Sequence, residues 1–157
     1  MNISRINTFF AAVACTFLIV SCTGDPLTPT PEIWSGAPIQ FEKADNADPD
    51  DAANQDRITD QVWITRGIAG GQIYNAVLES GANKDSSPEG TQWAIGTTEG
   101  LDTLTFGPFR QTVGNPQDVV GQKLVLLLEQ ENIAIDISFI SWSSGQKGGF
   151  AYERATN

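Results

Sequence analysis

The sequence contains no histidine and only two cysteines, and these absences exclude much familiar catalytic and metal chemistry. Without histidine there is no imidazole base near neutral pH, no Ser-His-Asp or Cys-His arrangement, and no imidazole ligand for a transition metal. Zinc therefore lacks its usual ligands, and any bound metal would be a hard cation held by oxygen atoms. The glycine-rich stretches at 67–71 and 144–149 lack the spacing of a phosphate-binding loop.

Basic residues are also scarce, with 9 Lys and Arg against 19 Asp and Glu and a formal net charge of −10. A surface of this kind repels the phosphate backbone of nucleic acids and the headgroups of anionic lipids. We therefore expect no nucleic-acid partner and no electrostatic attachment to a membrane. Neutral ligands, basic ligands and divalent cations suit this overall charge better.

The first 32 residues have the pattern of an export signal followed by a tether. An apolar run at 8–20 is about 13 residues long, shorter than the roughly 20 needed to span a bilayer. It ends in "IVSC" at 19–22, which is typical of a lipoprotein signal peptidase site. Segment 1–21 is then the signal peptide, Cys22 carries the lipid, and 22–32 is a Pro/Thr-rich tether. Ordinary secretion with a chance cysteine is the alternative.

The folded part, 33–157, has turn residues about every ten positions, and the runs between them are rich in β-branched and aromatic residues. The clearest alternation places Ile133, Ile135, Ile137 and Phe139 on one face of a strand and Asp136 on the other. Evidence for helices is limited to one short turn near 48–60. These patterns predict an all-β domain: an antiparallel β-sandwich of about eight strands, of which a jelly roll is one arrangement.

Three stretches resemble a β-rich module of secreted and surface proteins of marine bacteria, Bacteroidetes among them. They are "NQDRITDQVWITR" at 54–66, "SPEGTQWAIGTT" at 87–98 and "VVGQKLVLLLEQENIAIDISFISWSSGQKGGFAYER" at 119–154, and the resemblance extends from Ile33 to Arg154. It implies a β-rich extracellular domain, which in such proteins often stands beside sorting or adhesive segments. It implies no catalytic or binding residue, because no activity is assigned to the module.

The most acidic stretch, "KADNADPDDAANQDR" at 43–57, is a candidate calcium loop. Calcium takes six to eight oxygen ligands, and two-residue spacing could bring neighbouring aspartates onto one ion. The stretch lacks the glycine and the glutamate that an EF-hand requires at fixed positions. A solvated loop is the alternative, with one aspartate capping a helical turn and another paired with Arg57. The candidate metal ligands are Asp45, Asp48, Asp50, Asp51 and Asp56.

Two tryptophans are candidate platforms for a sugar, whose apolar face stacks on an indole ring while polar side chains bind its hydroxyl groups. Trp142 directly precedes the loop "SSGQKGG", and continued alternation would place it on the face of Asp136 and Ser138. For any single tryptophan, burial in the core is the alternative. The predicted ligand-binding residues are Trp142, Trp63, Asp136, Gln146 and Lys147.

Together these features predict a non-catalytic surface lipoprotein domain that binds a polysaccharide or surface glycan, or mediates adhesion. Its expected location is extracytoplasmic, lipid-anchored at the outer membrane or cell surface, with calcium as its only candidate cofactor. One alternative is an accessory subunit docked on an outer-membrane complex, which would present a contiguous apolar patch. The other is a small glycan-acting hydrolase, which needs two carboxyl groups across a cleft. Glu129 and Glu131 flank a hairpin tip instead.

Overall fold

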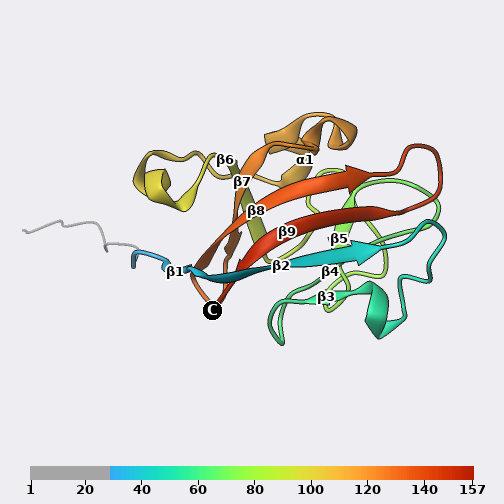
Figure 1. Cartoon of the computed structure of the whole chain (residues 1–157), viewed down its shortest axis with the longest axis horizontal. Coiled ribbons are helices and arrows are strands. Elements are labelled where there is room, and N and C mark those ends of the chain that lie inside the picture. The colour runs from blue at the N-terminus through green and yellow to red at the C-terminus, as the bar shows by residue number, and fades with distance from the viewer. Residues whose placement is uncertain (1–28) are drawn as a thin grey trace, which may run out of the picture.

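Two β-sheets face each other in the computed structural model, which describes residues 29–157 (Figure 1). The strands of the larger sheet are β1 (Glu32–Trp34), β2 (Gly36–Lys43), β6 (Thr91–Ile95), β7 (Lys123–Leu128), β8 (Ile133–Trp142) and β9 (Phe150–Thr156). Those of the smaller sheet are β3 (Asp56–Arg57), β4 (Trp63–Arg66) and β5 (Ile73–Asn75). The helical segments are short: α1 (Phe109–Val113) and the 3₁₀ turns η1 (Ala52–Asn54), η2 (Thr98–Thr103) and η3 (Pro116–Val119).

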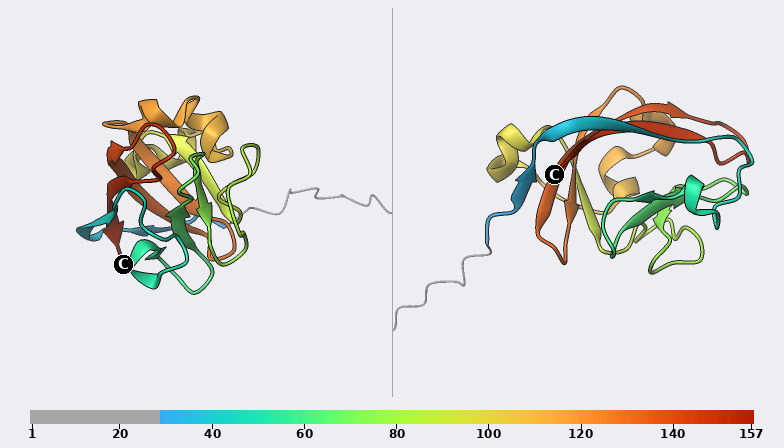
Figure 2. Two further views of the ribbon diagram at one scale, coloured as in Figure 1. Left: turned by 90° about the vertical axis from the view of Figure 1, so that its right-hand side faces the viewer. Right: turned by 60° about the horizontal axis from the view of Figure 1, so that its bottom comes forward.

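Antiparallel pairing dominates both sheets. The strand order is β2-β9-β8-β7-β6 in the larger sheet and β3-β4-β5 in the smaller one. Among the strands of residues 29–157, only β1 is parallel to its neighbour, pairing with the part of β8 that β9 does not reach. The larger sheet curves over the smaller one in the right panel of Figure 2, so the predicted antiparallel sandwich is confirmed. Strands β6 to β9 form a meander in chain order, whereas a jelly roll requires Greek-key crossings.

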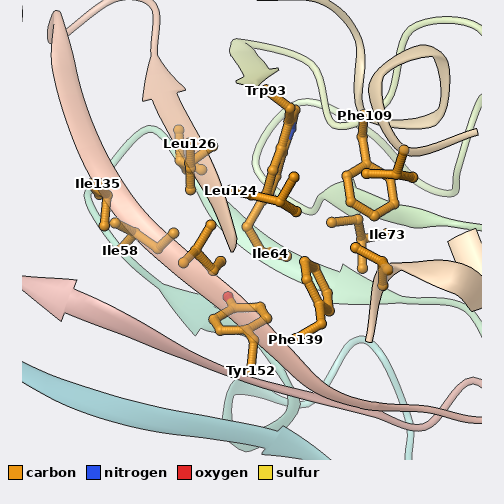
Figure 3. Close-up of a cluster of buried hydrophobic side chains, with 14 of the residues drawn as sticks. Ile58, Ile64, Ile73, Trp93, Phe109, Leu124, Leu126, Ile135, Phe139 and Tyr152 are labelled. Atoms are coloured by element: carbon orange, nitrogen blue, oxygen red, sulfur yellow. The ribbon is translucent and has the colours of Figure 1, made fainter. Parts of the chain in front are cut away.

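Side chains from both sheets meet in one hydrophobic core, shown in Figure 3. The alternation predicted for β8 is confirmed, because Ile135, Ile137 and Phe139 are buried. Each fully buried side chain of this size contributes about 1.5–3 kcal/mol to the free energy of unfolding. Besides Ile135 and Phe139, the core residues labelled in Figure 3 are Ile58, Ile64, Ile73, Trp93, Phe109, Leu124, Leu126 and Tyr152.

The chain between β6 and β7 extends this core at one edge of the sandwich. Phe109 of α1 is fully buried, and its ring centroid lies 5.0 Å from that of Trp93 in an edge-on arrangement. The ring centroid of Phe109 also lies 5.7 Å from that of Phe139 of β8. α1 is thereby fixed beside the C-terminal end of β8, where the candidate site lies.

Candidate functional site

A β-bulge near the end of β8 determines which face of the sheet carries Trp142. The register of β8 against β9 shifts between Phe139 and Ser141, so Ile140 is an extra residue in β8. An extra residue interrupts the two-residue alternation, and the side chains after it change face. The side chain of Trp142 therefore lies on the same inward face of the sheet as that of Phe139.

Trp142 lies half-buried among aromatic rings. Its ring centroid is 5.9 Å from that of Phe109, 5.7 Å from that of Phe139 and 6.2 Å from that of Phe150. The prediction that Trp142 shares a face with Asp136 was wrong, because the bulge adds a residue between them. The two side chains lie on opposite faces of β8 and do not meet in one site.

Arg66, the last residue of β4, lies against the Trp142 ring with its Cζ 4.2 Å from the ring centroid. The residue is only 3% exposed. Its Nε donates to the carbonyl of Gly71 at 3.0 Å, and its Nη1 donates to those of Ser143 at 3.1 Å and Gly149 at 2.9 Å. Within residues 29–157, Nη2 donates no hydrogen bond and no carboxylate pairs with the guanidinium.

This arrangement leaves Arg66 as a buried cation held by neutral carbonyl groups. Burial lowers the pKa of Arg66, and the charge of Asp45 only partly opposes that effect. A buried charge without an ionic partner is costly, and three charge-assisted hydrogen bonds offset part of the cost. An anion that reached Nη2 would supply the missing partner.

An open pocket of about 360 Å³ lies beside Arg66 and Trp142. Its volume is within the range of pockets that bind small molecules. The donors and acceptors around it are mostly amides and guanidinium groups, and none of the lining residues is acidic. The lining residues are Arg66, Ala69, Gly70, Gly71, Arg110, Asn115, Pro116, Gln117, Trp142, Gly145 and Gln146.

Close contacts between three loops shape this end of the molecule, which faces the viewer in the left panel of Figure 2. A Cβ atom on Gly148, which has a φ of +75°, would lie 2.5 Å from the carbonyl oxygen of Gly67. A Cβ atom on Gly149 would collide with the carboxylate of Asp45. The two glycines of "KGG" thus let the β8–β9 loop approach the neighbouring loops closely, in addition to giving its backbone conformational freedom.

Lys147 flanks the pocket without lining it. Its Nζ lies 3.4 Å from the Oδ2 of Asp45, and both side chains are substantially exposed. The hydroxyl of Ser143 also donates to Asp45, and this hydrogen bond, followed by that from Lys147, lowers the pKa of the Asp45 carboxyl. Of the predicted ligand residues, Trp142 and Gln146 therefore meet in the pocket, and Lys147 is engaged beside it.

The other two predicted ligand residues lie elsewhere. Asp136 accepts hydrogen bonds from the backbone N–H and the hydroxyl of Thr98, both at 2.8 Å. Trp63 donates from Nε1 to the carbonyl of Thr59 at 3.0 Å, and the Cζ of Arg57 lies 4.0 Å from its ring centroid. Neither Asp136 nor Trp63 lines the Trp142 pocket.

The acidic loop does not gather its carboxylates. Within residues 29–157, no group of three or more acidic, cysteine or histidine side chains is placed to hold a metal ion. Asp48 accepts from the N–H of Asp50 at 3.0 Å, closing a local turn, and Asp51 directly precedes η1. Asp56 is buried and paired with Arg154 of the larger sheet. Calcium binding by this loop remains a prediction.

A second buried cation lies next to this site. Lys43 is 1% exposed, and its Nζ donates to the carbonyls of Ala47 at 2.6 Å and Gly148 at 3.4 Å. Burial, and then the charge of Arg66, lower the pKa of Lys43. Two cations thus support the loops around the pocket, in a chain whose overall charge is strongly negative.

Comparison with protein-family models, curated proteins and solved structures finds no match. Cys22 and the predicted signal peptide fall outside the described residues. Among residues 29–157, no helix has the length and apolar character needed to cross a bilayer. The geometry around Arg66 and Trp142 therefore carries the functional argument.

Proposed function

We propose that this chain is a non-catalytic, lipid-anchored extracytoplasmic domain that binds carbohydrate in the pocket beside Trp142. The observation that carries the proposal is an indole ring bordering an open pocket whose other polar groups are amides and guanidinium groups. Such groups suit a ligand rich in hydroxyl oxygens, and the part of the indole left exposed offers an apolar contact to a sugar ring.

The arrangement also suggests how a sugar would bind. A sugar can stack on either face of a tryptophan ring that has no neighbours. The Trp142 ring, however, is already stacked on Phe109 and in contact with the guanidinium of Arg66. The sugar would therefore lie against the remaining exposed part of the indole while Gln117 and Gln146 bind its hydroxyl groups. Because the ring is fixed by its neighbours, little conformational entropy is lost when a ligand binds.

The test is retention of the chain carrying Cys22→Ser, which removes the predicted lipid attachment, on a panel of insoluble and gel-embedded polysaccharides. We expect retention on at least one glycan class. Each assay is run with calcium and with EDTA, and loss of retention in EDTA would support the predicted calcium loop. Failure to bind any glycan under both conditions would rule out the proposal.

An apolar surface at the other end of the sandwich supports a second candidate, an accessory subunit docked on a membrane complex. A groove of about 580 Å³ borders the N-terminal strand, and an adjoining groove shares Leu104 and Phe106 with it. Ile33 is 44% exposed and Ile95 is 56% exposed along these grooves. Exposed apolar surfaces of this kind are typical of protein interfaces. Co-purification of a defined membrane complex, lost with Ile95→Glu, would favour this candidate.

A further inference from the structure

We infer that the Trp142 pocket binds the acidic group of a charged glycan, the carboxylate of a uronic acid or a sulfate ester, through Arg66 and Arg110. This inference rests on the proposed function, because it names the ligand class of the same pocket. The two groups share one chemistry: an anionic oxygen cluster carried on a sugar ring.

The first support is the unused hydrogen-bonding capacity of Arg66. A guanidinium carries five N–H donors, and Arg66 uses its Nε and Nη1 on three backbone carbonyls. Nη2 has no acceptor among the described residues, and it is not one of their fully buried unpaired polar atoms, so it stays accessible although the residue as a whole is only 3% exposed and lines the pocket. The position of the Arg66 guanidinium is fixed by those three bonds and by the Trp142 ring, so the two remaining N–H donors on Nη2 are preorganised.

The second support is Arg110, which approaches the pocket from α1. Arg110 is exposed, and its side chain forms no ion pair with any described residue. Two arginines that come from different elements thus line one pocket. An anion held between them would form charge-assisted hydrogen bonds with both.

The third support is the contrast with the rest of the molecule. The chain carries 19 acidic residues against 9 basic ones, yet no acidic residue lines this pocket. By comparison, the groove of about 580 Å³ beside the N-terminal strand includes Glu99 and Asp102 in its lining. The overall charge disfavours anionic ligands at long range, so local selection of an anion requires a site from which carboxylates are excluded. A neutral sugar would leave the Arg66 charge uncompensated.

The test compares matched pairs of polymers by affinity electrophoresis of the Cys22→Ser chain. Polygalacturonate is compared with its methyl ester, and a sulfated galactan with its desulfated form, so that one member of each pair carries an anionic group that the other lacks on the same sugar backbone. We expect stronger retention on the charged member of at least one pair. The pair that responds identifies the acidic group as carboxylate or sulfate.

Arg110→Ala and Arg57→Ala provide matched variants, because both remove one exposed arginine and only Arg110 lines the pocket. Loss of a charge-assisted contact weakens binding by about tenfold or more, and we expect this for Arg110→Ala alone. Any one of three results would overturn the inference. These are equal retention on the charged and uncharged members of both pairs, equal binding by the Arg110→Ala and Arg57→Ala variants, or no retention on any of the four polymers. Binding to the wider polysaccharide panel would still leave the proposed function standing in each case.

Discussion

Arg154 of β9 binds Asp56 of β3 through two parallel hydrogen bonds that join the two sheets. Nε of Arg154 donates to Oδ2 at 2.6 Å, Nη2 donates to Oδ1 at 2.8 Å, and both residues are buried. The hydroxyl of Tyr152 donates to the same carboxylate at 2.6 Å. Burial alone would lower the pKa of Arg154, but the hydrogen bond and charge of Asp56 outweigh burial and raise it.

Removing the Asp56 charge should therefore destabilise the fold strongly. Asp56→Asn leaves the Arg154 cation buried without its partner, which typically costs roughly 3–5 kcal/mol of unfolding free energy. Asp85→Asn is the matched control, because Asp85 pairs with Lys84 at 3.1 Å on the exposed surface and its loss should change stability only slightly. Urea denaturation measures both, and equal costs would contradict the structural role of the buried pair.

Tyr152 should make stability fall at alkaline pH. Burial, followed by the charge of Asp56, raises the pKa of Tyr152 well above its ordinary value near 10. Above pH of about 10, the unfolded chain releases this proton while the folded chain retains it, so the unfolded state binds fewer protons and the free energy of unfolding decreases.

The measurement is the stability difference between the wild type and Tyr152→Phe as a function of pH. The difference should stay constant from pH 7 to 9 and shrink above about 10. Other titrating groups are common to both proteins and cancel. A difference independent of pH up to 11 would contradict the raised pKa of Tyr152.

Gly148 should tolerate alanine less well than Gly145 does. Both have a positive φ, +75° and +67° respectively, so alanine costs about 1–2 kcal/mol at either position. A Cβ atom at Gly145 meets no atom of the described residues within 4 Å, whereas one at Gly148 lies 2.5 Å from the Gly67 carbonyl oxygen. Thermal denaturation should therefore show a clearly larger loss for Gly148→Ala, and equal losses would show that these loops do not pack closely.

Trp142→Ala should lower stability as well as ligand binding. The half-buried indole packs against Phe109, Phe139 and Phe150, so truncation removes part of an aromatic cluster. Complete removal of a buried aromatic side chain costs about 3–5 kcal/mol, and a partly exposed one costs less, roughly 2 kcal/mol. An unchanged melting temperature would show that Trp142 does not belong to this cluster.

Much of the fold was predictable from local patterns. The alternation of Ile135, Ile137 and Phe139 identified an inward-facing strand, and the predominance of β-branched runs indicated a sandwich. The position of Trp142 was not predictable in this way, because it depends on the bulge at Ile140, and no local sequence signal marks that bulge. One added residue was enough to reverse the expected face.

The site itself was only partly predictable. Trp142 and Gln146 were candidates from the sequence. Arg66 comes to the pocket from β4, and Arg110 and Gln117 come from the segment between β6 and β7, both distant in sequence from the β8–β9 loop. One signal could have drawn attention to Arg66: a cation at the end of the apolar run "VWITR" directly before a glycine-rich loop. Asp56 was predicted as a metal ligand because it lies in an acidic stretch of the sequence. Its partner in the structure is Arg154, about a hundred positions away, which the local sequence could not indicate.

The most direct test of the central claim introduces a carboxylate into the pocket. Gln146→Glu places a negative charge among Arg66, Arg110 and Trp142, while Gln130→Glu adds the same charge at the exposed β7–β8 turn. The measurement is retention of both variants on the polysaccharide that binds the wild type, with melting temperatures as a check on folding. The account predicts that Gln146→Glu remains folded and loses retention, while Gln130→Glu binds like the wild type. Equal retention of the two variants would contradict it.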